Sequence, residues 1–145
     1  MSHTAALSTP AEARPGRGIQ IGLWVAQLLL ALAFGMAGAM KATTPYDQLA
    51  AAMSWVSYAP EALVRFIGIS EIAGALGLVL PALTRIQPRL TPLAAALLAF
   101  VMVLAAATHA WFGEWSGIGV NAVLGGLAAF VAWGRGVKAP IAPRA

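Results

Sequence analysis

The sequence contains no cysteine and only two histidines, His3 and His109. Without cysteine, the chain by itself forms no disulfide, performs no thiol redox chemistry and offers no thiolate ligand or cysteine-linked haem. Two histidines far apart in the sequence do not suggest a histidine-rich centre, so no metal site is expected. Soluble-enzyme motifs such as a phosphate-binding glycine loop, H-E-x-x-H or a serine nucleophile elbow are absent as well.

Charged residues are also scarce. They make up 10% of the 145 residues, whereas an average soluble domain has about 25%, and 60% of the residues are hydrophobic. The net charge of +4 does not indicate nucleic-acid binding, because the basic residues are scattered at the ends of apolar runs, as in membrane proteins. The composition therefore predicts an integral protein of the lipid bilayer with a single domain.

Four apolar runs are long enough to cross a bilayer, for which a helix needs about 20 residues. The expected helices cover about 19–41, 60–80, 92–112 and 117–134. Pro81 is expected to close the second helix, because proline has no N–H to continue the helical ladder. The predicted fold class is all-α, a four-transmembrane-helix bundle with a short interfacial helix between helices 1 and 2.

The interfacial helix is predicted within the connection 42–60. Apolar residues there recur at helical spacing, namely Tyr46, Leu49, Ala50, Met53 and Val56. Trp55 and Tyr58 suit the head-group level of a membrane. A plain surface loop is the alternative.

The domain layout is a membrane domain of residues 19–134 between a disordered tail, 1–18, and a second tail, 135–145. The apolar run 19–40 exceeds the 7–15 residues of a signal-peptide core, which favours a retained helix over a cleaved signal. Basic residues are biased seven to two toward the side of the tails. That side holds Arg14, Arg17, Arg85, Arg89, Arg135, Lys138 and Arg144, and the other holds Lys41 and Arg65. The bias predicts that both termini are cytoplasmic.

Glu71 is a lone carboxylate inside the second apolar run. Such a charge is costly in a bilayer unless it faces the protein interior and finds a partner. Lys41, His109 and Asn121 are expected near the same outer layer, because side chains lean toward the N-terminus of their own helix. Gln27 is a weaker candidate, because a single glutamine in a span commonly bonds between helices.

Two interpretations of these polar residues compete. In the first, Lys41 and Glu71 form an ion pair that locks the fold, with His109 and Asn121 as hydrogen-bonding partners. In the second, they form a polar site for a proton or an organic ligand, open to the outer face. Glu114 is expected to be a solvated turn residue. The sequence assigns no catalytic residue and leaves open whether the protein is an enzyme.

Three segments resemble a known family. They run from Gly35 to Lys41 (GMAGAMK), from Ile67 to Pro81 (IGISEIAGALGLVLP) and from Ala105 to His109 (AAATH). Together they resemble the DoxX-like family of small four-helix bacterial membrane proteins, over about residues 19–134. The resemblance implies a bacterial inner membrane location and a link to oxidoreductase assemblies, including a thiosulfate:quinone oxidoreductase. It also implies that Lys41, Glu71 and His109 occupy the family's polar positions.

The expected function is that of an accessory or ligand-binding subunit of a quinone-linked membrane oxidoreductase system. Because the chain has no cysteine, a redox role needs a quinone or a partner subunit. The alternative is a non-enzymatic protein that assembles or stabilises other membrane proteins through its glycine-rich helix faces, which also allow a homo-oligomer. A small transporter is less favoured, because four spans without inverted repeats or broken helices offer no element to rock.

Overall fold

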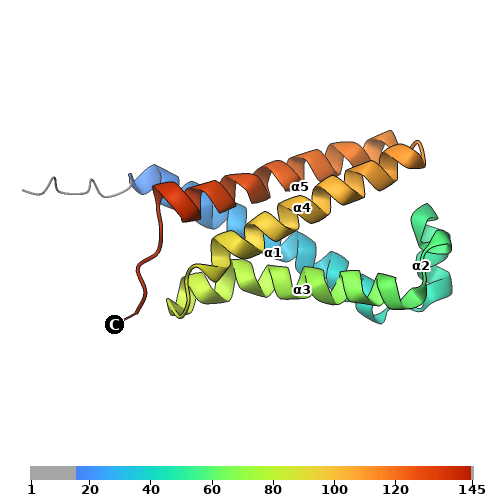
Figure 1. Cartoon of the computed structure of the whole chain (residues 1–145), viewed down its shortest axis with the longest axis horizontal. Helices are drawn as coiled ribbons and strands as arrows, with labels where there is room; N and C mark the ends of the chain where they lie inside the picture. The colour runs from blue at the N-terminus through green and yellow to red at the C-terminus, as the bar shows by residue number, and fades with distance from the viewer. Residues whose placement is uncertain (1–15, 145) are drawn as a thin grey trace, which may run out of the picture.

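The computed structural model describes residues 16–144, which contain helices and connecting segments but no strand (Figure 1). The elements are α1 (Arg17–Thr43), α2 (Tyr46–Ala52), the 3-10 helix η1 (Ser54–Tyr58), α3 (Glu61–Thr84), α4 (Leu90–Trp111), α5 (Trp115–Trp133) and the π-helical turn η2 (Gly134–Lys138). The predicted all-α class is confirmed, and so is the short helical segment between the first two long helices.

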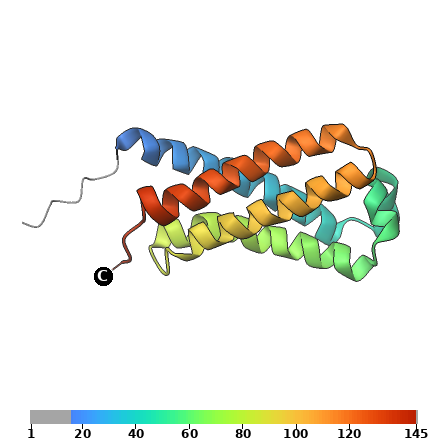
Figure 2. The same cartoon turned by 45° about the horizontal axis from the view of Figure 1, so that its top comes forward.

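The four long helices lie side by side, and α2 and η1 cross one end of the bundle (Figures 1 and 2). This end is called the α2 end below. The opposite end, where α1 begins and η2 finishes, is called the terminal end. Helices of 19 to 27 residues are about 28 to 40 Å long at 1.5 Å per residue, which matches a hydrocarbon core about 30 Å thick.

Large apolar side chains point outward from all four long helices. Leu32, Phe66, Phe100 and Val123 are each 60–66% exposed, and every long helix is apolar enough to cross a membrane. A soluble protein rarely carries such extended apolar surface, whereas lipid covers it without cost. The protein therefore spans the membrane several times and contacts the lipid bilayer.

The bundle consists of two tightly packed helix pairs. α1 packs most extensively against α3, and α4 packs most extensively against α5, while α3–α4 and α1–α5 contacts join the pairs. One apolar core runs between them, with Leu30, Phe34, Leu78, Leu98 and Val131 buried at its centre.

The α1–α3 pair depends on two glycines. A Cβ atom on Gly38 would lie 2.6 Å from the carbonyl oxygen of Gly68, and one on Gly68 would lie 2.8 Å from the carbonyl oxygen of Gly38. Backbone meets backbone at this crossing, so no side chain fits on either side. Such close approach favours helix association in lipid, where packing replaces the hydrophobic drive.

The expected end of the second span at Pro81 is wrong, because α3 continues through Pro81 to Thr84. The missing N–H removes only the helical bond to the carbonyl of Gly77, and Pro81 and Ala82 are buried against the bundle, so packing outweighs that loss. The helix stops where Arg85 adopts a left-handed conformation, with φ of 58°.

The long helices also extend beyond the expected limits at the terminal end. α1 already begins at Arg17, and η2 carries the last helix on to Lys138. The backbone N–H of Arg144 donates to the carbonyl of Arg85 at 3.0 Å, which ties the chain after η2 to the α3–α4 turn. Residues 1–15 of the expected N-terminal tail lie outside the described residues.

The close contact of Gly38 with Gly68 predicts that two alanine substitutions in α1 have different effects on stability. Gly38→Ala places a methyl group against the backbone of α3 and should destabilise the protein by about 1–3 kcal/mol, the usual cost of overpacking. Gly22→Ala is the matched control, because no atom of residues 16–144 lies within 4 Å of its added Cβ and alanine is the better helix former. Thermal unfolding in detergent, followed by circular dichroism, measures both. Equal midpoints for the two variants would contradict the account.

Candidate functional site

Lys41 and Glu71 form a buried ion pair. The Lys41 Nζ lies 2.8 Å from Oε2 and 3.0 Å from Oε1 of Glu71, and the two side chains are only 12% and 6% exposed. The ammonium group thus contacts both carboxylate oxygens. Isolated charges at this depth would be costly, but the pair neutralises each of them.

The glycine crossing explains why these two side chains meet. Lys41 follows Gly38 by three residues and Glu71 follows Gly68 by three residues, on helices that run in opposite directions. Along its own helix, each charged residue therefore lies about 4.5 Å beyond the glycine, at 1.5 Å per residue. Each side chain leans back toward the N-terminus of its own helix, so both converge on the crossing between them.

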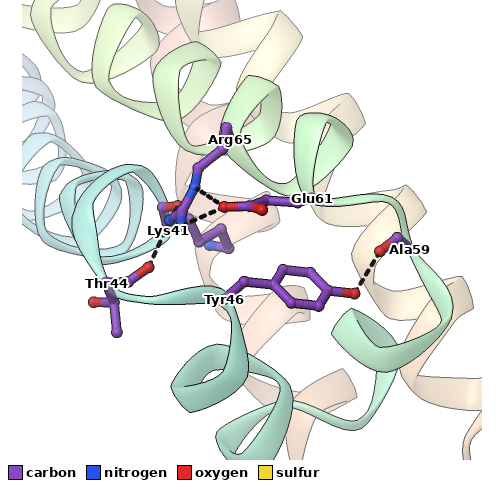
Figure 3. A network of polar contacts seen from close by, with 6 residues as sticks. All are labelled: Lys41, Thr44, Tyr46, Ala59, Glu61 and Arg65. Atoms are coloured by element: carbon purple, nitrogen blue, oxygen red, sulfur yellow. Dashed lines mark hydrogen bonds and ion pairs between the residues drawn. The ribbon is translucent and has the colours of Figure 1, made fainter.

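Arg65 completes the polar layer at the C-terminus of α1 (Figure 3). Its Nη1 donates to the carbonyl oxygens of Lys41 and Thr44, both at 2.7 Å, and its Nη2 pairs with the Glu61 carboxylate at 2.9 Å. Carbonyl groups at a helix C-terminus have no helical donor, and the guanidinium group supplies one. Lys41 is thereby fixed at its backbone as well as at its side chain.

Tyr46 fixes the α2–η1 segment in the same region. Its hydroxyl lies 2.7 Å from the carbonyl oxygen of Val56 and 2.8 Å from that of Ala59, and Figure 3 shows the contact to Ala59. Leu49, Val56 and Val64 form a small buried cluster beneath it. The segment is therefore packed against the bundle.

His109 bonds to a residue that the sequence places in a solvated turn. Its Nδ1 lies 2.6 Å from Oε2 of Glu114, and the Ser54 hydroxyl donates to Oε1 of the same carboxylate at 2.6 Å. These hydrogen bonds, that from Ser54 most strongly, hold the pKa of the Glu114 carboxyl below its ordinary value of 4.5. Glu114 is therefore ionised at neutral pH and connects α4 to η1.

A glycine turn brings Glu114 back over the end of α4. The N–H of Glu114 donates to the carbonyl of His109 at 2.9 Å, and the N–H of Gly113 donates to that of Ala110 at 3.2 Å, while Gly113 has φ of 71°. This is the Schellman pattern of a helix C-terminus. Gly113 is the sequence signal that could have indicated the return of Glu114 to His109.

A pocket of about 330 Å³ opens beside the His109–Glu114 pair. It is called the α2-end pocket below and is lined by Ala52, Met53, Trp55, His109, Glu114, Ser116 and Gly117. A Cβ atom on Gly117 would lie 2.5 Å from Nδ1 of His109, so the absence of a side chain there makes room for the imidazole ring. The pocket thus combines a hydrogen-bonding pair with apolar and aromatic walls.

Gln27 lies in the half of α1 nearer the terminal end and belongs to a separate network. Its Nε2 donates to the carbonyl of Leu78 at 2.6 Å, and its Oε1 accepts from Nε of Arg135 at 2.7 Å. Nη1 of Arg135 donates to Oε1 of Gln20 at 2.6 Å, and its guanidinium group lies 5.3 Å from the Trp24 ring centre. Arg135 is only 3% exposed; the sequence assigns it to a tail and gives no signal of this network.

Asn121 lies apart from the other candidates. It is 7% exposed and lines a groove between α4 and α5, where its Nδ2 has no hydrogen-bond partner within residues 16–144. The structure therefore brings Lys41 and Glu71 into contact, whereas His109 bonds to Glu114 and Asn121 faces the groove. Within residues 16–144, no group of three His, Asp or Glu side chains could hold a metal ion.

The ion pair predicts a non-additive mutant cycle. Glu71→Leu alone leaves a buried ammonium group without its partner and should cost about 3–5 kcal/mol, whereas Lys41→Met combined with Glu71→Leu should restore most of that loss. Unfolding by SDS titration from detergent micelles gives the free energies of the unmodified protein, of Glu71→Leu, of Lys41→Met and of the double variant. If the double variant is as unstable as the sum of the single ones, the two charges do not stabilise each other.

Comparison with known proteins adds a family assignment. The chain matches the DoxX-like family over residues 25–131, which is more than half of its 145 residues and includes Lys41, Glu71 and His109. No curated protein and no solved structure gives a significant match. With four helices able to cross a membrane, the chain is an integral membrane protein that belongs to the DoxX-like family.

Proposed function

We propose that this protein is a ligand-binding accessory subunit of a quinone-linked membrane oxidoreductase, and that it holds the quinone head group in the α2-end pocket. The observation that supports the proposal is the His109–Glu114 pair at 2.6 Å beside a pocket of about 330 Å³. A quinone head group is an apolar ring with two carbonyl oxygens, so it needs apolar walls and a hydrogen-bonding group in one place.

The His109–Glu114 pair suits both redox forms of such a ligand. Because Glu114 is ionised, it accepts a hydrogen bond from the Nδ1–H of His109. In the neutral ring Nε2 then carries no proton and can accept a hydrogen bond. A neutral ring accepts from the hydroxyl of a quinol, and a protonated ring donates to the carbonyl of a quinone. The pair thereby holds a proton within reach of the ligand oxygen.

The walls of the pocket fit the rest of the ligand. Trp55 and Met53 offer polarisable apolar surface for a ring, and the pocket lies where the long helices end, close to the lipid that would receive an isoprenoid tail. When bound, a quinone supplies two-electron redox chemistry, and the electrons come from the partner oxidoreductase.

A second candidate function is a non-enzymatic one, the assembly or stabilisation of other membrane proteins. The observation that favours it is the Lys41–Glu71 pair, in which the ammonium group contacts both carboxylate oxygens. Because both carboxylate oxygens of Glu71 already accept from Lys41, the pair offers no unoccupied acceptor to a ligand. Its role is then to stabilise the packing of α1 against α3.

The proposed orientation places the terminal end in the cytoplasm of a bacterium and the α2-end pocket on the outer side of its inner membrane. Within residues 16–144 the terminal end holds six basic residues and no acidic one. They are Arg17, Arg85, Arg89, Arg135, Lys138 and Arg144. Basic residues concentrate on the cytoplasmic side of membrane proteins, which supports this orientation.

The orientation predicts the labelling of two single-cysteine variants, which the cysteine-free sequence makes simple to read. Ser57→Cys in η1 should react with a membrane-impermeant maleimide added to intact cells, because it lies at the α2 end. Arg144→Cys should react only after the membrane is permeabilised. Labelling of both variants from the same side would overturn the topology.

The quinone proposal predicts a loss of binding in one variant of α4. A short-chain benzoquinone titrated into the detergent-purified protein should quench the fluorescence of Trp55, and Trp55→Phe identifies its share of the signal. His109→Leu should weaken binding about tenfold or more, the value of a hydrogen bond to a charged group.

Thr108→Val is the matched control, because the Thr108 hydroxyl donates to the backbone of its own helix at 3.0 Å and does not line the pocket. It should bind like the unmodified protein. If the unmodified protein does not bind the quinone, or if His109→Leu binds as well as the control, the α2-end pocket is not a quinone site and the assembly function becomes the better account.

A further inference from the structure

A groove on the lipid-facing side of α4 and α5 contains a polar group that the protein does not use. The groove has a volume of about 360 Å³ and is lined by Ala99, Phe100, Met102, Val103, Ala106, Asn121, Ala122, Gly125, Gly126 and Ala129. Asn121 lines it while only 7% exposed, and its Nδ2 has no partner within residues 16–144. Inside a bilayer no water is present to satisfy such an amide.

The α5 wall of the groove is built from small residues. Ala122 and Gly126, and likewise Gly125 and Ala129, are four residues apart, the spacing that lets a second helix approach closely. Gly125 is already used within the protein, since a Cβ atom there would lie 3.2 Å from Cβ of Met102. Gly126, in contrast, has nothing within 4 Å of its added Cβ, so a side chain there would meet no other part of residues 16–144.

We propose that this groove is the interface of a homodimer in which Asn121 of each copy hydrogen-bonds to Asn121 of the other. Two copies inserted with the same topology are related by a two-fold axis along the membrane normal. A residue near that axis meets its own counterpart at the same depth. An amide group carries both a donor and an acceptor, so it is complementary to a second copy of itself.

The Nδ2 atom of Asn121 is itself buried. The terminal amide torsion of asparagine is soft, so rotation about it brings Nδ2 to the groove when a second copy docks. Phe100 contributes to the same fit. It stands at the edge of the groove and is 60% exposed. In a two-fold interface each copy places its Phe100 ring against the small residues of the other, because every contact occurs twice.

A second copy fits better than a lipid chain in this groove. A hydrocarbon tail fills apolar space but leaves the Asn121 amide without a partner, at the cost of an unpaired polar group in an apolar medium. The partner amide removes that cost. The dimer therefore explains the groove and the orphaned amide together, and it is independent of the quinone proposal.

Substitutions at two open glycines test the interface. Gly126→Leu has room within one chain and fills the groove, so it should give a folded monomer. Gly22→Leu is the control, because its added Cβ also has nothing within 4 Å and it lies on α1. Energy transfer between labelled copies in liposomes, as a function of protein-to-lipid ratio, measures the association. Asn121→Leu should weaken it about three- to thirtyfold, the range for a hydrogen bond between helices in a membrane.

Cross-linking of single-cysteine variants tests whether the two copies meet at the groove. In the cysteine-free background, Ala122→Cys should form a disulfide-linked dimer on mild oxidation, whereas Ala73→Cys, exposed on α3, should not. A monomeric unmodified protein, unchanged association of Gly126→Leu, or equal cross-linking at both cysteines would overturn the dimer. So would a lipid that co-purifies in the groove while Ala122→Cys stays monomeric.

Discussion

The Lys41–Glu71 ion pair at the Gly38–Gly68 crossing is the contact on which the rest of the structure depends. In lipid, apolar surface does not drive helices together, so close packing and polar contacts must do so. The two glycines bring the backbones of α1 and α3 into contact, and the charged side chains one turn further along each helix close over that contact. Neither charge is acceptable in the bilayer alone; together they fix which helices pair and in which register.

The two ends of the bundle differ in which partners their charged side chains have. Toward the α2 end, the acids Glu61, Glu71 and Glu114 each have a basic or imidazole partner. The Glu71 pair joins α3 to α1, and Glu114 also accepts a hydrogen bond from Ser54 of η1. At the terminal end, Arg135 is buried with glutamine side chains and an indole ring instead of a carboxylate. The first end thus pairs these three carboxylates next to a pocket, whereas within residues 16–144 the second end holds six basic residues and no acidic one.

Much of the fold follows from the sequence, because the bilayer leaves few alternatives. The length of the apolar runs predicts the four spans, and the lean of side chains along a helix predicts that Lys41 and Glu71 converge. The contacts of His109 and Arg135 could not be predicted in the same way. His109 finds Glu114 through a left-handed turn at Gly113, and the Arg135 network requires η2 to bring a residue expected in a tail beside α1. The end of α3 could not be predicted from Pro81 either. The helix continues past this proline because packing of its last turn outweighs one missing hydrogen bond.

The distance between the charged groups of Lys41 and Glu71 in a lipid bilayer tests the central claim most directly. The sequence has two lysines, Lys41 and Lys138, which lie at opposite ends of the bundle. With ¹⁵N on lysine Nζ and ¹³C on glutamate Cδ, few lysine–glutamate pairs can therefore give a signal. Solid-state NMR should detect a ¹⁵N–¹³C dipolar coupling between Nζ of Lys41 and Cδ of Glu71, because Nζ lies 2.8 and 3.0 Å from the two oxygens bonded to that carbon. The coupling should disappear in Lys41→Met. A bilayer sample without that coupling would contradict the account.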